Sequence, residues 1–273
     1  MSTGKIPKIH SRPVMSSTLR CLQVLEVLAQ EPNSFGFSDI ADALGIDKTS
    51  AHRFIHTLIA AGFVECNPHS RSYHLAGKAL WVGTGHLRYS PVYRAAYGEL
   101  ESLAHSTETM AHLGVWDNDT VLYLHTVGPP RTVLLFTDVG QRRPVHSTAL
   151  GKALLAYRPA EDLERVLASN SLRYTDKTIT SVDAMREELV RIRRQDYALD
   201  DEEGIPGLRC MAAVIRDSRG EAVGALSMSG SLAQLTDAKI PHYARLVQQA
   251  ALRASSQLGY RDYAPYLLSA LGG

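Results

Sequence analysis

Hydrophobic residues in the first part of the chain recur with the spacing of short amphipathic helices. Leucines occupy every third position from residue 19 to residue 28, as expected for a helix with one buried side. Pro32 interrupts that pattern. Ser38 and Gly45 then have the residue types that commonly begin and end a helix. We therefore predict two helices in this stretch, the second of them short.

A third predicted helix has two chemically different sides. Asp47 is a good N-cap for it and Gly62 a good stop. One side is hydrophobic and consists of Ala51, Phe54, Ile55, Leu58 and Ile59. The other side carries hydrogen-bond donors, namely Lys48, Thr49, His52, Arg53 and His56. No acidic residue interrupts this donor side after Asp47. Such a side suits either contacts with DNA or a solvated polar face, which is the usual outer side of an amphipathic helix.

Two β-prone runs follow the third helix, on either side of a turn at residues 67–70. Three helices and a hairpin in this order are typical of a winged helix-turn-helix. The second helix of the helix-turn-helix, here the third helix of the chain, enters the DNA major groove. We predict a DNA-binding domain over residues 16–76. Its predicted DNA contacts are Lys48, Thr49, Ser50, His52 and Arg53 on the helix and Arg71 on the wing.

The rest of the chain predicts linker helices and a second domain. Residues 77–107 are predicted to be helical, and their aromatic residues suit either intrachain packing or a dimer contact. Alternating hydrophobic residues predict strands over 110–116, 120–127, 132–137, 209–217 and 222–230. Amphipathic helices are predicted over 147–156, 159–168, 181–195 and 236–258. An antiparallel sheet with these helices gives an α+β domain over 108–262. Residues 1–15 and 263–273 are predicted to be a flexible arm and a tail.

Composition and charge limit the functional classes. The 273 residues suggest two domains, and the sequence contains neither an apolar leader nor an apolar stretch of membrane-spanning length. The three cysteines, Cys21, Cys66 and Cys210, form no CxxC pair, which argues against a zinc or disulfide framework. The net charge is only +1, so contact with nucleic acid has to come from local charge. We expect a cytoplasmic protein with no cofactor and no membrane partner.

Three stretches, taken in order, resemble one family. They are HRFIHTLIAAGFVE with the following SRSYHLAGKALWVG, then PVHSTALGKALLA, and then YALDDEEGIPGLRCMAAVIRD followed by VGALSMSGS. Over residues 17–260 the chain resembles the IclR family of bacterial transcriptional regulators. The resemblance implies a winged helix-turn-helix, a linker helix and a GAF-like effector-binding domain. It also implies a homodimer or homotetramer on operator DNA that represses or activates catabolic operons in response to a small effector.

The family's effector pocket matches four segments of this chain. The residues concerned are Ala149, Leu150, Asp200, Cys210, Ser227 and Ser229. The helix N-terminus predicted at Ala149 would offer N–H groups to an anion. Ser227 and Ser229 are two apart on a predicted strand, so their hydroxyls share one face, together with Val223 and Ala225. This set suits a small carboxylic acid, either a short keto or hydroxy acid or an aromatic acid.

Several of these residues also have simpler explanations, which the sequence leaves open. Cys210 suits a small buried hydrophobe, and the two serines suit backbone contacts on an edge strand. Asp200 begins the acidic run 200–203, which by itself suggests a solvated loop. Arg142 and Arg143 offer an alternative anchor for an anion. The apolar wall of the pocket is expected from Leu135, Phe136 and Val139.

Two other functional classes compete with a ligand-responsive DNA-binding regulator. The first is an enzyme in which Cys210 and His146 form a nucleophile–base pair. The sequence contains no GxSxG, GxGxxG, P-loop or HExxH motif that would support it. The second is a winged-helix module that contacts another protein. We favour the regulator, in which the effector shifts the balance between DNA-competent and DNA-incompetent forms through the linker at 77–107.

Overall fold

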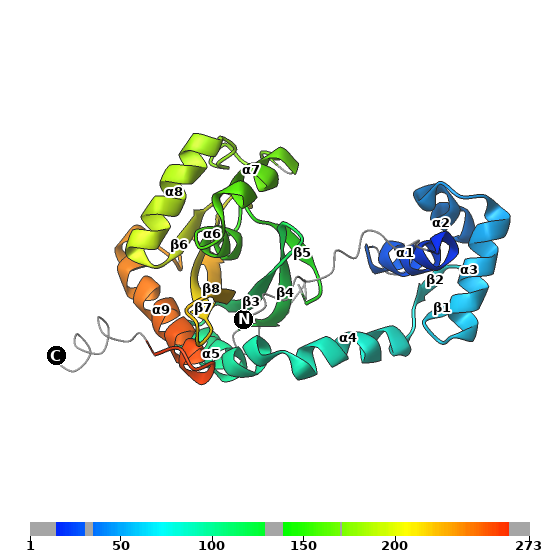
Figure 1. The fold of residues 1–273 in the computed structure, drawn as a ribbon, viewed down its shortest axis with the longest axis horizontal. Helices are drawn as coiled ribbons and strands as arrows, with labels where there is room; N and C mark the ends of the chain where they lie inside the picture. Colours follow the sequence, from blue (N-terminus) through cyan, green and yellow to red (C-terminus); the bar gives the residue numbers. More distant parts are fainter. Residues whose placement is uncertain (1–14, 31–34, 129–138, 170, 262–273) are drawn as a thin grey trace, which may run out of the picture. The chain divides into compact units, whose positions relative to one another are not determined.

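The computed structural model describes residues 15–30, 35–128, 139–169 and 171–261. The chain divides into two compact units, Met1–His86 and Leu87–Gly273 (Figure 1). Three predictions fall outside the described residues: the arm over 1–15 apart from Met15, the strand over 132–137, and the tail over 263–273. Leu135 and Phe136, expected in the wall of the pocket, also lie outside them.

The described part of the first unit contains three helices and a two-stranded hairpin, and a fourth helix begins in it. These elements are α1 (Ser16–Gln30), α2 (Phe37–Leu44), α3 (Lys48–Ala60), β1 (Val64–Cys66), β2 (Tyr73–Leu75) and α4 (Gly77–Tyr89). The apolar sides of the first three helices meet in one core, which holds Val24, Leu28, Ile40, Ile55 and Leu58. The predicted order of three helices and a hairpin is confirmed.

Short polar contacts fix where α2 and α3 begin. Asp47 caps α3 as predicted, because its carboxylate accepts the Ser50 N–H at 2.9 Å and the Ser50 hydroxyl at 2.7 Å. The cap predicted at Ser38 is wrong, because this residue lies inside α2. The carboxylate of Asp39 instead accepts the N–H of Gly36 at 2.7 Å. A side chain reaching back from inside the helix thus replaces an N-cap side chain.

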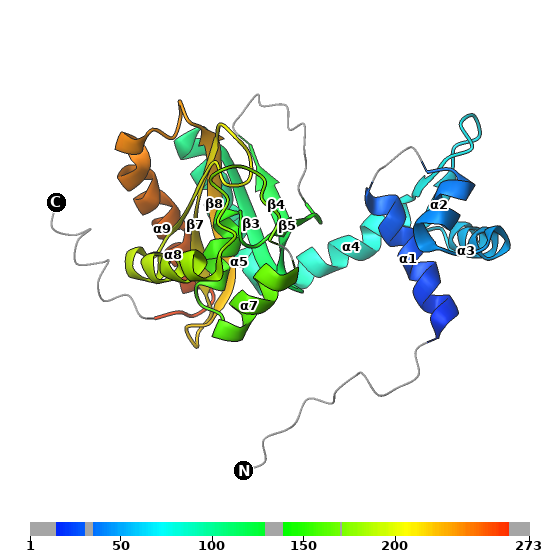
Figure 2. The ribbon, with the colours of Figure 1, turned by 90° about the horizontal axis from the view of Figure 1, so that it is seen from above.

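The second unit is an α+β domain, as predicted. Its elements are α5 (Pro91–Thr107), β3 (Met110–Asp117), β4 (Thr120–Val127), β5 (Arg142–Pro144), α6 (Ala149–Leu155), α7 (Ala160–Ser169), α8 (Val182–Gln195), β6 (Ala198–Asp201), β7 (Leu208–Arg216), β8 (Ala222–Ser231), the 3-10 helix η2 (Asp237–Lys239) and α9 (Ile240–Gln257). Among the described residues, six strands form one antiparallel sheet in the order β5-β4-β3-β8-β7-β6. Helices cover both of its faces (Figure 1, Figure 2).

Each face of this sheet has its own hydrophobic core. Helices α6, α7 and α8 pack on one face, around Leu154, Met185 and Ile192. Helices α5 and α9 pack on the other face, where Leu100 and Val247 are buried. Helix α5, the later part of the predicted linker over 77–107, is therefore also a layer of the second unit. No helix in the described stretches combines the length and the apolar character needed to cross a lipid bilayer.

A bulge in β8 divides a set of residues that the sequence placed on one face. Opposite β7, Ile215 pairs with Gly224 and Arg216 with Ala222, so Val223 is skipped. Val223 packs with the core of α5 and α9, whereas Ala225 packs with the core of α6, α7 and α8. The prediction that Val223 shares the face of the two serines is wrong, because one extra residue reverses the alternation of side chains.

Candidate functional site

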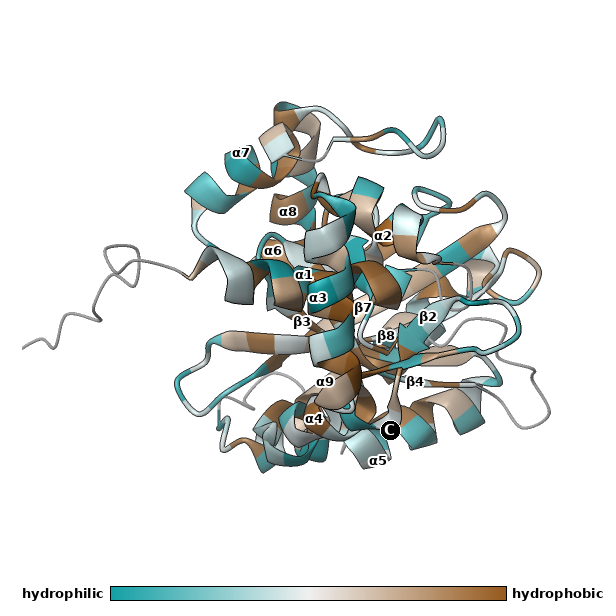
Figure 3. Ribbon diagram, turned by 90° about the vertical axis from the view of Figure 1, so that its right-hand side faces the viewer, coloured by the Kyte–Doolittle hydropathy of each residue, from teal (hydrophilic) through white to brown (hydrophobic). Residues whose placement is uncertain are grey.

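The donor side of α3 faces solvent. Ala51, Ile55 and Leu58 are buried, whereas the predicted donors Lys48, Thr49, His52, Arg53 and His56 are exposed. Figure 3 shows hydrophilic and hydrophobic residues alternating along this helix. Within the described residues, Lys48 and Arg53 have no ion-pair or side-chain hydrogen-bond partner. Their charges are therefore available to an anion outside the protein.

Other polar groups near this surface are already engaged. The hydroxyl of Ser50 donates to the Asp47 carboxylate, so it serves the helix cap. The rings of His52 and His56 lie 4.2 Å apart between centroids, and the Phe37 ring lies edge-on to His52 at 5.7 Å. These contacts hold the two imidazoles side by side on the exposed face of the helix.

The predicted wing places Arg71 at the end of a tight turn. The side-chain oxygen of Asn67 accepts the N–H of His69 at 2.9 Å and of Ser70 at 3.3 Å. Arg71 follows with a φ of +56°, and its N–H donates to the Asn67 carbonyl at 2.9 Å. Arg71 is exposed in the loop that joins β1 and β2. The local sequence therefore fixes the backbone of the wing, while the Arg71 guanidinium is exposed to solvent.

The second unit contains a cavity of about 550 Å³ that brings together all six residues of the predicted effector site. Its walls include Ala149, Leu150, Asp200, Cys210, Ser227 and Ser229. The sequence did not select His112, Tyr123 and Tyr174, which also line it. Val139 is exposed and lies outside this lining. Residues that are far apart in the sequence thus line the same cavity.

The floor of the cavity is built from neighbours across the sheet. Asp200 on β6 pairs with Cys210 on β7, which pairs with Ser229 on β8, and Met110 on β3 completes this row. The next row contains Ala198, Ala212, Ser227, His112 and Thr126. Because β8 is a central strand, the alternative of serines on an edge strand is wrong. Cross-strand pairing explains why these side chains meet.

The polar groups of the floor contact one another. The Ser229 hydroxyl donates to the Cys210 sulfur at 3.1 Å. Burial, together with the neighbouring Asp200 carboxylate, raises the pKa of the Cys210 thiol far above its usual range. Nδ1 of His112 lies 3.1 Å from the Thr126 hydroxyl. The floor therefore offers hydroxyls, an imidazole and a neutral thiol rather than a reactive thiolate.

The first residues of α6 form another wall of the cavity. Ala149 and Leu150 begin the helix, so their N–H groups have no acceptor within it. The hydroxyl of Thr148 accepts the Gly151 N–H at 3.1 Å and donates to the Pro144 carbonyl at 2.7 Å. Thr148 is therefore the N-cap of α6. The cap leaves the two earlier N–H groups at the cavity wall.

His146 is placed differently from the other predicted residues. It is fully buried, and its Nε2 donates to the Leu172 carbonyl at 3.0 Å. Burial lowers the pKa of this imidazole, which favours its neutral form. His146 does not line the cavity that contains Cys210, and its ring stacks instead on Tyr174 at 6.0 Å. Nothing in the described residues couples the two side chains of the competing enzyme hypothesis.

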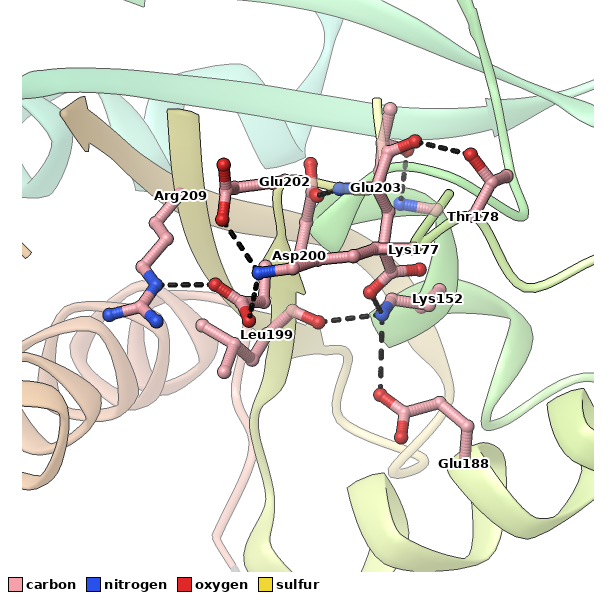
Figure 4. Close-up of polar contacts among 12 residues, drawn as sticks. Lys152, Lys177, Thr178, Glu188, Leu199, Asp200, Glu202, Glu203 and Arg209 are labelled. Carbon is pink, nitrogen blue, oxygen red and sulfur yellow. Dashed lines mark hydrogen bonds and ion pairs between the residues drawn. The ribbon is translucent and has the colours of Figure 1, made fainter. Parts of the chain in front are cut away.

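The acidic run at 200–203 is partly buried, so its interpretation as a solvated loop is wrong. Asp200 is 4% exposed and Glu203 is 5% exposed. The carboxylate of Asp200 accepts the Glu203 N–H at 2.7 Å, and Glu203 pairs with the buried Lys152 (Figure 4). The other two acidic residues of the run, Asp201 and Glu202, bind the Lys177 ammonium at 3.0 and 2.6 Å.

The two adjacent arginines differ in position. Arg142 is exposed and donates from Nε to the Asp117 carboxylate at 2.8 Å, whereas Arg143 lines the cavity. This difference follows from the alternation of side chains along β5. The same alternation applies to His112. It lies two residues after Met110 on β3, so the two side chains share one face of the sheet. Alternation can locate such residues only after the strand and its buried face are known.

Two family descriptions match the chain over most of its length. "Bacterial transcriptional regulator IclR C-terminal" matches residues 85–256, and "IclR helix-turn-helix domain" matches residues 17–68. The HTH-type transcriptional regulator KdgR of Escherichia coli K12 is 30% identical over 250 residues. That alignment covers 91% of this chain and 95% of KdgR.

Solved structures have the same fold. An IclR transcriptional regulator from Alicyclobacillus acidocaldarius superimposes with a TM-score of 0.81 at 26% identity, covering 90% of this chain and all of the other. An IclR homologue from Microbacterium hydrocarbonoxydans, in complex with 4-hydroxybenzoate, gives a TM-score of 0.78 at 23% identity. That match covers 89% of this chain and 99% of the homologue.

Proposed function

This chain belongs to the IclR family of bacterial transcriptional regulators, and we propose that a small carboxylic acid bound in its cavity controls its binding to operator DNA. Its helix-turn-helix is a DNA-binding domain and its C-terminal domain a ligand-binding domain. It is a regulator rather than an enzyme. The observation that carries the proposal is that all six predicted effector residues line one cavity.

The chemistry of the cavity supports an acid as the effector. The N–H groups of Ala149 and Leu150 and the hydroxyl of Ser227 can donate to a carboxylate, and Arg143 adds positive charge at the wall. Asp200 can accept a hydrogen bond from a hydroxyl or water of the ligand. The homologue from Microbacterium hydrocarbonoxydans binds 4-hydroxybenzoate, which has both groups. A cavity of about 550 Å³ has room for an aromatic ring as well as for a short keto or hydroxy acid.

The donor surface of α3 supports docking in the major groove. We propose that Lys48, Thr49, Ser50, His52 and Arg53 contact phosphates or base edges, and that Arg71 contacts the backbone from the wing. The unpaired charges of Lys48 and Arg53 suit this role, because phosphate contacts supply much of the affinity for DNA. Ser50 can take part only through an oxygen that also serves the helix cap.

Exposed hydrophobic residues on α4 support self-association. Leu80, Trp81, Val82 and Tyr89 are exposed, and α4 has no buried residue. Such a surface is typical of an interaction site. We propose a homodimer or homotetramer in the cytoplasm, in which two copies of α3 read the two halves of a palindrome. The helices over 77–107 would pass the response to the effector from the cavity to the DNA-binding domain.

A paired measurement tests the proposal. A panel of small carboxylic acids, screened by thermal shift, should contain members that raise the melting temperature. The double variant Ser227→Ala, Ser229→Ala should lose that shift, whereas Ser218→Ala, on an exposed turn, should keep it. The stabilising acid should also change the affinity for duplex DNA from upstream of the gene, measured by fluorescence anisotropy. An acid that stabilises the protein without changing DNA affinity would contradict the regulatory link.

A further inference from the structure

A buried cluster of charges adjoins the cavity. Lys152 on α6 is fully buried, and its ammonium donates to the Leu199 carbonyl at 2.6 Å (Figure 4). It pairs with Glu203 and, at 3.3 Å, with Glu188 on α8. Glu203 in turn donates its N–H to Asp200, which lines the cavity. These contacts join the effector site to an interior ionic network.

The charges in this cluster do not balance. Three carboxylates, those of Glu188, Asp200 and Glu203, are each only 4% to 5% exposed. Two cations face them, the buried Lys152 and the exposed Arg191, which pairs with Glu188. One negative charge is therefore in excess. In addition, Oε2 of Glu203 is buried and has no hydrogen-bond partner among the described residues, which disfavours the ionised form.

An acidic effector would add to this excess. Asp200, Cys210 and Ser229 are successive cross-strand neighbours. Ser227, which would donate to the carboxylate of the effector, lies two strands across and two residues along from Asp200. Strands in a sheet are about 4.8 Å apart and residues about 3.4 Å apart along a strand, so that carboxylate lies roughly 12 Å from Asp200. The intervening Cys210 thiol carries no charge to screen the two groups. A further negative charge would thus enter the same region, opposed by the Arg143 guanidinium at the cavity wall.

We propose that binding of a carboxylate effector is coupled to the uptake of a proton by the Asp200–Glu203 pair, so that effector affinity falls as the pH rises above neutrality. This inference rests on the proposed function. Burial, opposed by Lys152, raises the pKa of Glu203 to about 7, and burial also raises the pKa of Asp200. The free protein therefore has a site close to half-protonation at neutral pH, where an added anion acts most strongly.

The size of the effect follows from the distance. At about 12 Å and an effective dielectric constant of about 20, the added charge changes the proton affinity roughly tenfold. Below about pH 6.5 the free protein already holds the proton, so the affinity for the effector should be constant. Between about pH 6.5 and 8.5 it should fall roughly tenfold. The carboxyl group of the effector is ionised throughout this range and contributes no change of its own.

Calorimetry of the full chain tests the coupling. Benzoate and pyruvate serve as probes, in phosphate and in Tris at pH 7.5, because the buffers differ in ionisation enthalpy. The difference in apparent binding enthalpy should correspond to uptake of about half to one proton. Glu203→Gln should abolish most of the uptake and flatten the pH profile. Glu187→Gln, the same change at an exposed position of α8, should leave both unchanged.

The outcomes separate this inference from the function on which it rests. Binding of either probe to the wild-type chain without proton uptake overturns the coupling and leaves the effector proposal standing. Persistent uptake in the Glu203→Gln variant overturns the assignment of the proton. If neither probe binds and no acid in the thermal-shift panel does, both proposals fail. Should Glu203→Gln not fold, as judged by circular dichroism, the two-buffer measurement on the wild-type chain still decides.

Discussion

Two lysines show how differently the two units use the same side chain. Lys48, at the start of α3, is exposed and has no ion-pair partner among the described residues. Lys152, in α6, is fully buried between two carboxylates and a backbone carbonyl. A buried charge has to be satisfied inside the protein, whereas an exposed one stays hydrated and open to an external anion. The first unit thus presents charge outward, and the second uses charge to organise its interior.

Removing the interior cation should have the largest effect. Lys152→Met leaves the carboxylates of Glu188 and Glu203 without their buried partner, which should lower the free energy of unfolding by about 3–5 kcal/mol. Urea denaturation monitored by circular dichroism measures the change. Lys177→Met removes two ion pairs of an exposed lysine instead and should cost far less. Equal losses in the two variants would remove the contrast between buried and exposed charge.

The pH dependence of stability should also distinguish the buried charges of the second unit from exposed ones. The folded chain keeps the proton of Glu203 up to about pH 7, whereas the unfolded chain releases it near the ordinary pKa of 4.5. The folded state binds more protons in this interval, so the Glu203 contribution to stability declines as pH rises from about 4.5 to 7. Between pH 4.5 and 7, the free energy of unfolding of the Glu203→Gln variant should therefore rise by about 2–3 kcal/mol relative to that of the wild type. Parallel stability curves for the two proteins would refute the raised pKa.

On the exterior surface, the expected loss is in DNA binding rather than in stability. Arg53→Ala should weaken binding to the specific operator by about 1–3 kcal/mol if Arg53 reads a guanine. The melting temperature should not change, because the side chain is exposed and unpaired. Arg245→Ala, an exposed change on α9, is the matched control for loss of charge. A similar loss of affinity in both variants would indicate a general electrostatic effect and not recognition by α3.

The smallest expected effect concerns Lys48. If it contacts one phosphate, Lys48→Ala should reduce the slope of log affinity against log salt by about 0.9, with a modest loss of affinity for every DNA sequence. Fluorescence anisotropy at several salt concentrations measures the slope. An unchanged slope would mean that the exposed ammonium stays in solvent when DNA binds.

Short-range patterns located the helices and the hairpin of the first unit, although the cap predicted at Ser38 was wrong. The apolar stripe and donor side of α3 are both visible at helical spacing, and Asp47 precedes the helix as a cap side chain should. The same holds for Ser227 and Ser229, whose shared face follows from alternation on β8. In each case the residues that determine the shared face or the helix cap lie within a few positions of one another in the sequence. Alternation failed at Val223, because a bulge depends on the pairing with β7.

The interior of the second unit depended on distant partners. Asp200 and Glu203 lie in a run of four acidic residues that looks solvated on its own. They are buried because Lys152, remote in sequence, provides the opposite charge from α6. His112 reaches the cavity through its pairing with Ser227 on β8. No single-segment pattern contains this information, and only the family resemblance had marked Asp200 as part of a pocket.

Gly151 limits how the ligand preference of this protein can evolve. A Cβ at this position would lie 2.2 Å from the Val145 carbonyl oxygen and 2.4 Å from the Val145 Cα, so the first turn of α6 admits no larger residue here. That turn presents the N–H groups at the cavity wall. We therefore expect changes in ligand preference to arise in lining side chains such as Tyr174 and Ile205 rather than at Gly151.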